Sequence, residues 1–589
     1  MSRKLDEKRK DILENEIGTV FKNKGLTPVS VALIYPNTYY VGQSNLGFQT
    51  IYGILNKRLD VRCERAFIPE EEDEKELKRI NQHLFSLESG QLLKEFDFLA
   101  FSISFELDYV NVIKILDLAG IPVFSEDRDD QYPLIIAGGP CMTFNPEPLA
   151  DILDLVIIGE GEEVINELFD LYSSHLTGDL VINRDKFLLE AAKIPGVYVP
   201  KFYQEQYDEG GKYLGTKPVV EGVPEKITRR WIKNLDDFPT RSVILTPNTE
   251  FGNMFLIEVS RGCGRHCRFC MAGYCYRPPR VRSLKSILKQ VEEGKEHRDR
   301  IGLMGAAISD YPWIDELCKE LNANNLSVSV ASFRVDSVTP TLLKTLVAGG
   351  LRTLTVAPEA GSERLRKVIN KGISEEDIMK ASCIALQEGM EQIRYYLMIG
   401  LPTETEGDLQ EIVNLIEKVN KHAKQFRKGG FRKISLSVNP FIPKPFTPFQ
   451  WEAMDYRVNL EKKIKWLKQH LNKYKNLEIS AESPRLTVIQ GLLARGDRKL
   501  SKVLVSAYRA GGNLTAWKKA LGEEGLDFDF YLYRQRTKEE IFPWDHLDWG
   551  VDKEYLWEER LKAEKKEFTP SCLPNSCRRC GVCGKEEGN

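Results

Sequence analysis

Hydrophobic residues in the first third of the chain gather in short apolar runs, each followed by a stretch of helical period. Four such runs span residues 29–35, 98–104, 134–139 and 155–159. Strands buried on both faces have this continuous apolar character, and their alternation with helices predicts a doubly wound parallel sheet over residues 1–180. Such sheets bind ligands at the carboxyl ends of their strands. The residues at this predicted rim are Ser102, Ser104, Gly138, Gly139, Gly159 and Gly161.

A second alternation of strands and helices begins at residue 254. Apolar strands are expected at 254–260, 301–308, 327–332, 352–357, 392–399 and 433–439. Helices are expected between them at 283–298, 311–324, 339–348, 374–389 and 404–422. Six strand–helix units over residues 246–455 predict a partial (β/α)6 TIM-type barrel, whose functional residues lie at the C-terminal ends of the strands.

The remaining segments differ from both strand–helix regions. Residues 181–245 are polar, punctuated by proline and glycine, and are expected to connect the two α/β regions. Four prolines between residues 440 and 451 preclude a helix there, residues 456–566 are expected to be mostly helical, and residues 567–589 form a cysteine-rich tail. The predicted fold class is therefore α/β: a Rossmann-like N-terminal domain, the barrel, a helical C-terminal region and the tail.

Net charge and the absence of targeting segments in this sequence restrict the expected classes of function. The 83 basic and 86 acidic residues nearly balance, so the whole chain has no electrostatic footprint for nucleic acid. The first ten residues are polar, unlike a signal peptide, and no apolar run approaches the ~20 residues that span a bilayer. We therefore expect a cytoplasmic protein with no membrane partner, in which clustered cysteines are metal ligands rather than disulfides.

Three cysteines after the first barrel strand, Cys263, Cys267 and Cys270, form a C-x3-C-x2-C loop. Three thiolates this close together can hold three corners of a [4Fe–4S] cubane and leave the fourth iron without a protein ligand. The alternative is zinc, which takes four ligands in structural sites, and Cys275 is the nearby candidate for a fourth. The barrel pattern around the loop favours iron.

The tail carries four more cysteines in C-x4-C-x2-C-x2-C spacing, namely Cys572, Cys577, Cys580 and Cys583. A zinc ribbon usually separates its two cysteine pairs by a dozen residues or more, whereas this compact spacing is closer to that of ferredoxins. The tail is therefore expected to bind a second [4Fe–4S] cluster, with structural zinc as the rival and unliganded thiols as the third alternative.

The cysteine spacing, the aromatic Phe269 before the third cysteine and the strand in front of the loop resemble the radical S-adenosylmethionine (SAM) superfamily. The resemblance implies that Cys263, Cys267 and Cys270 are the catalytic cluster ligands and that Phe269 lies beside the cofactor. The open iron would chelate the amino and carboxylate groups of SAM. One electron from an external flavodoxin- or ferredoxin-type donor would then cleave SAM and release a 5′-deoxyadenosyl radical.

Four further motifs follow in the order of this superfamily, each at the end of a predicted strand. Gly305 begins Gly-Ala-Ala where many members carry Gly-Gly-Glu, so the backbone alone is left to receive the SAM amino group. The resemblance assigns Ser332 and Arg334 to the SAM carboxylate and ribose, and the planar fork of arginine suits a carboxylate. It assigns Glu359 to the ribose hydroxyls or the amino group, and Gly400 to the Gly-Leu-Pro turn after the wall under adenine.

The N-terminal half resembles the cobalamin-binding-type domain that precedes many radical SAM cores. Gly138-Gly-Pro and Gly159-Glu-Gly-Glu-Glu carry this resemblance. The Asp-x-His-x-x-Gly signature, which supplies a lower histidine ligand to cobalt, is missing, and no histidine occurs between residues 1 and 82. The domain is therefore expected either to bind cobalamin without that histidine or to serve packing and substrate docking.

Together these features favour a radical SAM enzyme of a family with a cobalamin-binding-like N-terminal domain and a cysteine-rich C-terminus. If cobalamin binds, the expected reaction is methylation of an unactivated carbon or phosphorus centre. The alternatives are a methylthiotransferase-like or other radical modification of RNA or protein without cobalamin, and a catalytically silent iron–sulfur protein. The basic stretch at 462–475 suits either RNA phosphates or a solvated helix face, so the sequence does not identify the substrate.

Overall fold

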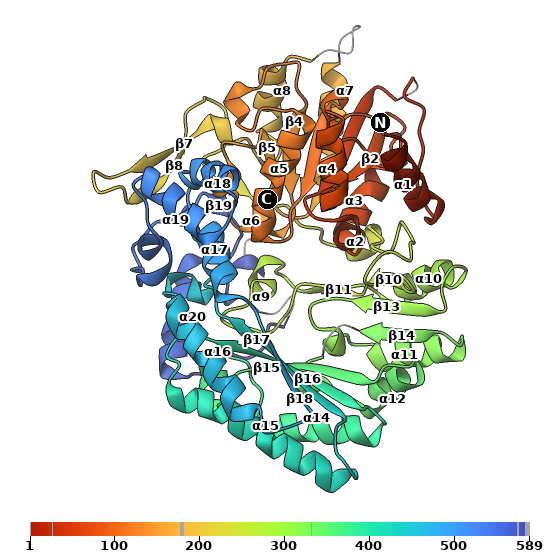
Figure 1. Cartoon of the computed structure of the whole chain (residues 1–589), viewed down its shortest axis with the longest axis vertical. Coiled ribbons are helices and arrows are strands. Elements are labelled where there is room, and N and C mark those ends of the chain that lie inside the picture. Colours follow the sequence, from red (N-terminus) through yellow and green to blue (C-terminus); the bar gives the residue numbers. More distant parts are fainter. Residues whose placement is uncertain (1, 26, 177–181, 331–332, 574–576, 584–589) are drawn as a thin grey trace.

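The computed structural model describes residues 2–25, 27–176, 182–330, 333–573 and 577–583. Two α/β bodies lie one above the other, and helices from the C-terminal third run along one side and contact both (Figure 1). Within the described ranges, no helix combines the length and apolar character that a bilayer crossing requires.

The N-terminal body is a six-stranded sheet in the order β2-β1-β3-β4-β5-β6. All neighbouring strands are parallel except β5 and β6, so the predicted doubly wound sheet is confirmed. The strands are β1 (Val29–Tyr35), β2 (Val61–Phe67), β3 (Phe98–Ser102), β4 (Leu134–Gly138), β5 (Leu155–Ile157) and β6 (Val197–Tyr198). The helices are α1 (Arg3–Glu14), α2 (Tyr39–Gln43), α3 (Leu46–Lys57), α4 (Glu71–Arg79), α5 (Tyr109–Ala119), α6 (Pro140–Phe144), α7 (Gly161–His175) and α8 (Arg184–Ala191).

Strand β2 was not among the expected strands, because its sequence contains the charged residues Arg62, Glu64 and Arg65. All three are buried. Their charges are compensated inside the fold: Arg62 pairs with Glu64, and Arg65 lies 2.6 Å from carboxylate oxygens of two other glutamates. Buried charges are tolerated where they are paired in this way, so a strand can form without an apolar run.

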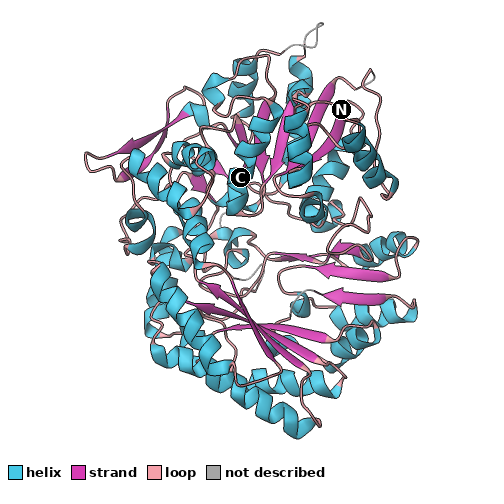
Figure 2. Ribbon diagram, viewed as in Figure 1, coloured by secondary structure: helices cyan, strands magenta, loops and turns pink. Residues whose placement is uncertain are grey.

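The second body contains all six strands expected for the barrel: β10 (Phe255–Glu258), β13 (Arg300–Met304), β14 (Ser327–Val330), β15 (Thr353–Glu359), β16 (Gln392–Ile399) and β17 (Lys433–Pro440). They form two parallel sheets, and a parallel bridge between Phe333 and Val356 joins them. Helices cover the outer side (Figure 2). These helices are α10 (Leu284–Lys295), α11 (Ile314–Ala323), α12 (Pro340–Ala348), α13 (Glu363–Val368), α14 (Glu375–Gln387) and α15 (Glu406–Phe426).

The expected count of six strands needs one correction, because a seventh parallel strand, β18 (Leu477–Ala481), pairs with β17. It lies in the region expected to be mostly helical, directly after α16 (Arg457–Leu471). β18 is a five-residue edge strand with no fully buried residue. It therefore lacks the apolar run by which the other strands were recognised.

The helices of the C-terminal third divide between the two bodies. Helix α16 buries its apolar residues in the core of the barrel, whereas α17 (Pro484–Arg495), α18 (Leu500–Arg509) and α19 (Leu514–Glu523) share one hydrophobic core with the N-terminal sheet. The last helix, α20 (Lys553–Lys565), leads into the cysteine-rich tail. The connecting segment contains the hairpin of β7 (Tyr203–Tyr207) and β8 (Tyr213–Pro218), followed by β9 (Ile227–Thr228), which pairs with β19 (Leu547–Asp548).

Candidate functional site

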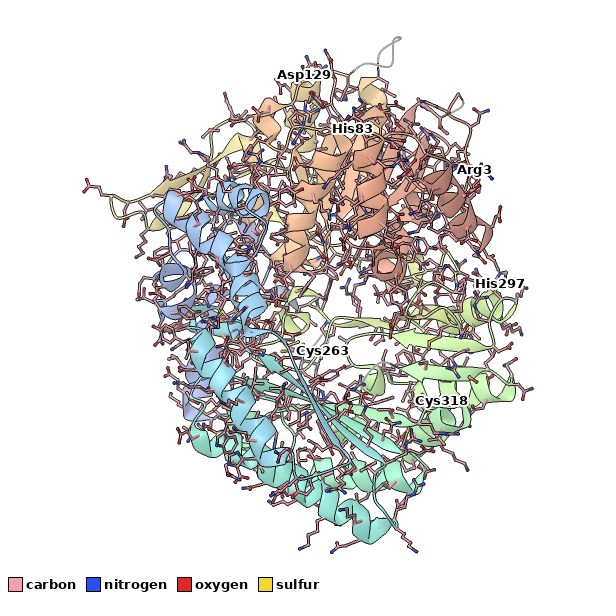
Figure 3. All side chains as sticks on the ribbon, in the orientation of Figure 1. Arg3, His83, Asp129, Cys263, His297 and Cys318 are labelled. Atoms are coloured by element: carbon pink, nitrogen blue, oxygen red, sulfur yellow. The ribbon has the colours of Figure 1, made fainter. Side chains whose placement is uncertain are left out.

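The central cysteine loop spans residues 262–279 and projects from β10 into the space between the two bodies, where Figure 3 labels Cys263. Two short antiparallel strands form its neck, β11 (Ser260–Arg261) and β12 (Arg280–Val281), and α9 (Ala272–Cys275) lies inside it. Gly262 opens the loop at φ +80°, where a Cβ atom would lie 2.3 Å from a backbone oxygen. The turn into the cysteines therefore requires glycine.

The three predicted cluster ligands lie in one desolvated group. Burial, together with the charges of Cys267 and Cys263, raises the pKa of Cys270 to about 12. Burial likewise raises the pKa of Cys263, with a further contribution from Cys267. Three adjacent, partly buried thiolates are unstable without positive charge, and the irons of a cluster supply such charge. This donor set fits three corners of a cubane.

Among the residues that the structure describes, no three His, Cys, Asp or Glu side chains are grouped closely enough to hold a single metal ion. A [4Fe–4S] cubane binds its cysteines through separate irons, so its ligands need not form such a tight group.

A pair of charged residues lies beside the thiols. Lys371 Nζ lies 3.0 Å from Glu359 Oε1 and 5.9 Å from the centre of the Phe269 ring. Arg334 donates to the Lys371 carbonyl oxygen at 3.0 Å. The charge of Lys371 opposes part of the rise in the pKa of Cys270, which is consistent with its position beside the cysteine loop. The structure thus brings Glu359, Arg334 and Phe269 together as predicted, around a lysine that the sequence analysis missed.

Glu359 has φ +66°, an uncommon backbone conformation for a residue other than glycine. It ends β15, where the ladder with β16 shifts register. Non-glycine residues held in this region are found preferentially at functional sites, which fits the role predicted for Glu359. Lys371 was missed because Asn370-Lys371-Gly372 follows a helix and reads as an exposed turn, although Lys371 is only 8% exposed.

The other predicted cofactor residues differ in their surroundings. Gly305 follows β13 and is exposed toward the space between the bodies, but a Cβ atom there would lie 2.6 Å from Ser260 Oγ. Gly400, at φ +75°, turns the chain after β16 and packs against Leu460 of α16. Ser332 lies outside the described residues.

The tail docks on the central loop. The Cys572 backbone N–H donates to the Gly264 carbonyl oxygen at 2.6 Å. Cys572 and Cys583 line the same open cleft as Cys263, with a volume of about 1020 Å³. Burial and the neighbouring Cys577 raise the pKa of Cys572 to about 11. The two cysteine groups therefore share one cleft, although the tail cysteines' role as metal ligands stays a prediction.

A second cavity, of about 420 Å³, lies between the N-terminal sheet and the cysteine loop and is mainly apolar. All six residues predicted at the rim of the sheet line it. From this rim it extends between the strands and helices α3 and α7, where Leu55, Ile165 and Phe169 line it. Its opposite wall contains β11 and Gly262 of the cysteine loop, Met304 at the end of β13, and Gly305 and Ala306 after that strand.

Two protein-family models match this chain, one in each α/β body. Residues 47–200 match the family of radical SAM proteins, N-terminal, and residues 257–416 match the radical SAM superfamily. The chain is 34% identical over 498 residues to the uncharacterised protein MJ0966 of Methanocaldococcus jannaschii, covering 83% of this chain and 94% of that protein. It is 24% identical over 258 residues to the ribosomal protein uS12 methylthiotransferase RimO of a Thermotoga species, covering 40% and 58%.

Among solved structures, the chain is similar to the radical SAM methyltransferase TsrM from Kitasatospora setae with cobalamin and a [4Fe–4S] cluster bound. The identity is 13%, the TM-score is 0.48, and the match covers 84% of this chain and 99% of TsrM. The family matches include the cysteine loop and its flanking strands, and they favour an enzyme over a catalytically silent protein. The chain belongs to the radical SAM superfamily, whose enzymes use a [4Fe–4S] cluster and SAM.

Proposed function

We propose that this enzyme is a cobalamin-dependent radical SAM methylase that transfers a methyl group to an unactivated carbon or phosphorus centre. The observation that carries the proposal is the apolar cavity between the carboxyl ends of the N-terminal strands and the cysteine loop. A second cofactor bound there would face the cluster directly, and bound methylcobalamin would supply the methyl group.

The size and lining of this cavity support a bulky ligand. Protein interiors are close-packed, whereas a space of about 420 Å³ stays open here between the N-terminal sheet and the cysteine loop. The volume lies within the range of about 300–1,000 Å³ that is usual for small-molecule sites, and its mainly apolar lining is also typical of them. Its position at the carboxyl ends of a parallel sheet is the usual ligand site of such folds.

The residues around the cavity suggest how it would hold a corrinoid. Gly138 and Gly139 at the rim allow close backbone approach, and the slot between the sheet and α3 suits a flat apolar group. Asn45 and Ser104 supply polar groups near the rim. No histidine is among the described residues that line the cavity, which supports binding without a lower histidine ligand.

At the SAM site we propose that Arg334 and Lys371 hold the SAM carboxylate and that Glu359 accepts hydrogen bonds from the ribose or the amino group. The two cations and the carboxylate lie within one buried group beside the cysteines, which supports these roles. A flavodoxin- or ferredoxin-type protein would supply the electron.

A second candidate is a methylthiotransferase-like reaction on RNA or protein, with a tail-bound cluster as the sulfur or electron site. The open cleft shared by Cys263, Cys572 and Cys583 favours it, and RimO is named as a methylthiotransferase. In this alternative the N-terminal cavity would hold no corrinoid.

Filling the cavity tests the proposal. A Cβ atom at Gly138 would have Ile157 as its nearest neighbour, at 3.8 Å, so Gly138→Phe can fill the space without a clash at Cβ. We expect the wild-type chain, reconstituted anaerobically with hydroxocobalamin, to retain about one corrinoid after gel filtration. Gly138→Phe should retain none, whereas Gly522→Phe, on the open surface of α19, should bind like the wild type. Retention by Gly138→Phe, or none by the wild type, would contradict the proposal.

A further inference from the structure

The neck of the cysteine loop carries two arginines directly opposite one another. Arg261 on β11 and Arg280 on β12 are cross-strand partners in an antiparallel pair. Like charges in this arrangement repel each other and destabilise the pairing. Because only two residues on each strand form this neck, it needs a compensating charge from elsewhere to stay closed.

That charge comes from the N-terminal body. Glu160 Oε1 accepts from Arg280 at 2.6 Å, and Glu160 Oε2 accepts from Arg280 at 3.0 Å and from Arg261 at 2.8 Å. The backbone N–H of Ile232, in the connecting segment, also donates to Oε2, at 2.9 Å. One buried carboxylate thus takes four donors from the two neck strands and the connecting segment.

The surrounding charges are nearly balanced. Glu162 lies 2.8 Å from Arg261, and Glu258 pairs with Arg261 at 3.0 Å and with Arg282 at 2.7 Å. Glu160 is the residue among them that contacts both cross-strand arginines. Removal of its charge would leave the Arg280 guanidinium without the carboxylate that pairs with it, directly opposite Arg261.

We propose that Glu160 is a positioning residue that closes the neck of the cysteine loop and fixes the loop against the N-terminal body. Glu160 immediately precedes α7 and lines the apolar cavity together with Arg261. A ligand seated in that cavity therefore contacts the residue that holds the loop. The N-terminal domain thus sets the position of the cluster even before a second cofactor binds.

The metal-free chain tests this proposal by hydrogen exchange at the neck amides, residues 260–262, 280 and 281. The Glu160→Gln substitution keeps the shape of the side chain but removes its charge. We expect hydrogen exchange of the neck amides to accelerate by roughly a hundredfold. Glu163→Gln is the matched control, because Glu163 lies on the same helix, is 44% exposed and pairs with Arg230 instead. It should exchange like the wild type.

A double variant separates positioning from general instability. Glu160→Gln with Arg280→Gln also removes one of the opposed guanidinium groups, so neck protection should largely return. After cluster loading, Glu160→Gln should alter the paramagnetic resonance spectrum of the reduced cluster with SAM, and the control should not. Wild-type exchange and an unchanged spectrum in Glu160→Gln would overturn the proposal. The proposal would also be overturned if hydrogen exchange in Glu160→Gln accelerated evenly over the whole chain and the double variant did not restore protection of the neck. None of these readouts requires a corrinoid.

Discussion

The central loop and the tail are both short cysteine-rich segments, but the fold holds them differently. The central loop is braced from several sides: buried Arg268 donates to the carbonyl oxygen of Val368, and His266 lies 2.7 Å from the Tyr555 hydroxyl. The tail buries Cys580 and Val582 in the hydrophobic core that includes the N-terminal sheet, and its Cys572 backbone N–H donates to the central loop itself. The fold therefore positions the loop, and the loop helps to position the tail.

This difference implies an order of dependence. A metal centre at the central loop should survive loss of the tail, because its bracing comes from the barrel, α20 and the N-terminal body. Four predictions test the comparison, beginning with the largest expected effect.

Replacing Cys263, Cys267 and Cys270 together by Ala should abolish SAM cleavage and remove about four irons per chain. The physical reason is that these thiolates are the predicted protein ligands of the cluster. Iron analysis and detection of 5′-deoxyadenosine check it, with Cys383→Ala as a control outside both groups. Formation of 5′-deoxyadenosine by the triple variant would remove the loop from the site.

Truncation before Ser571 should leave the central cluster in place while iron falls by about four atoms, or zinc by about one. An iron–sulfur centre in the tail predicts reduced turnover, and a zinc ion predicts impaired docking of substrate with SAM cleavage retained. Metal analysis and turnover assays on the same sample distinguish the two. Unchanged metal content and activity would show that the four tail cysteines bind no metal needed for activity. Loss of the central cluster would show that the central loop depends on the tail, which contradicts the order of dependence given above.

Glu359→Ala, Arg334→Ala and Lys371→Ala should each weaken SAM binding by about tenfold or more, because each removes a charge-assisted contact. Iron content should stay at the wild-type level, since none of the three is a thiol. Titration of cluster-loaded protein with SAM measures the effect. Lys367→Ala is the control, because that side chain is 59% exposed. Wild-type affinity in a variant removes that residue from the proposed site.

The last prediction is a pH dependence of stability at the neck. Arg261 and Arg280 outweigh the effect of burial and lower the pKa of Glu160 to about 2 from an ordinary 4.5. A carboxyl group whose pKa is lower in the folded than in the unfolded state stabilises the fold at pH values above the unfolded-state pKa. For Glu160 this stabilisation amounts to about 3 kcal/mol, and it is lost as the pH falls from about 4.5 to 2. Acid unfolding should therefore be less steep in Glu160→Gln than in Glu163→Gln. Equal slopes would contradict this account of the neck.

Much of the fold could be predicted because the strands of both bodies are mostly apolar runs. Strands β2 and β18 were not predicted, because neither is an apolar run. β2 buries compensated charges such as Arg65, and β18 is a half-exposed edge strand. At the site, the cysteine spacing, Phe269 and the preceding strand predict Cys263, Cys267 and Cys270 as cluster ligands, and this role stays a prediction. The burial of Lys371 and the role of Glu160 depend on contacts between distant segments, which no local pattern encodes.

The central claim is that a corrinoid in the N-terminal cavity faces the cluster of the central loop. Paramagnetic resonance on protein that carries cob(II)alamin and the reduced cluster together tests it most directly, because two unpaired spins near one another alter each other's signals. The account predicts magnetic coupling that disappears in Gly138→Phe, with no nitrogen ligand on cobalt. Two independent, unperturbed spectra in the fully loaded wild-type enzyme would contradict it.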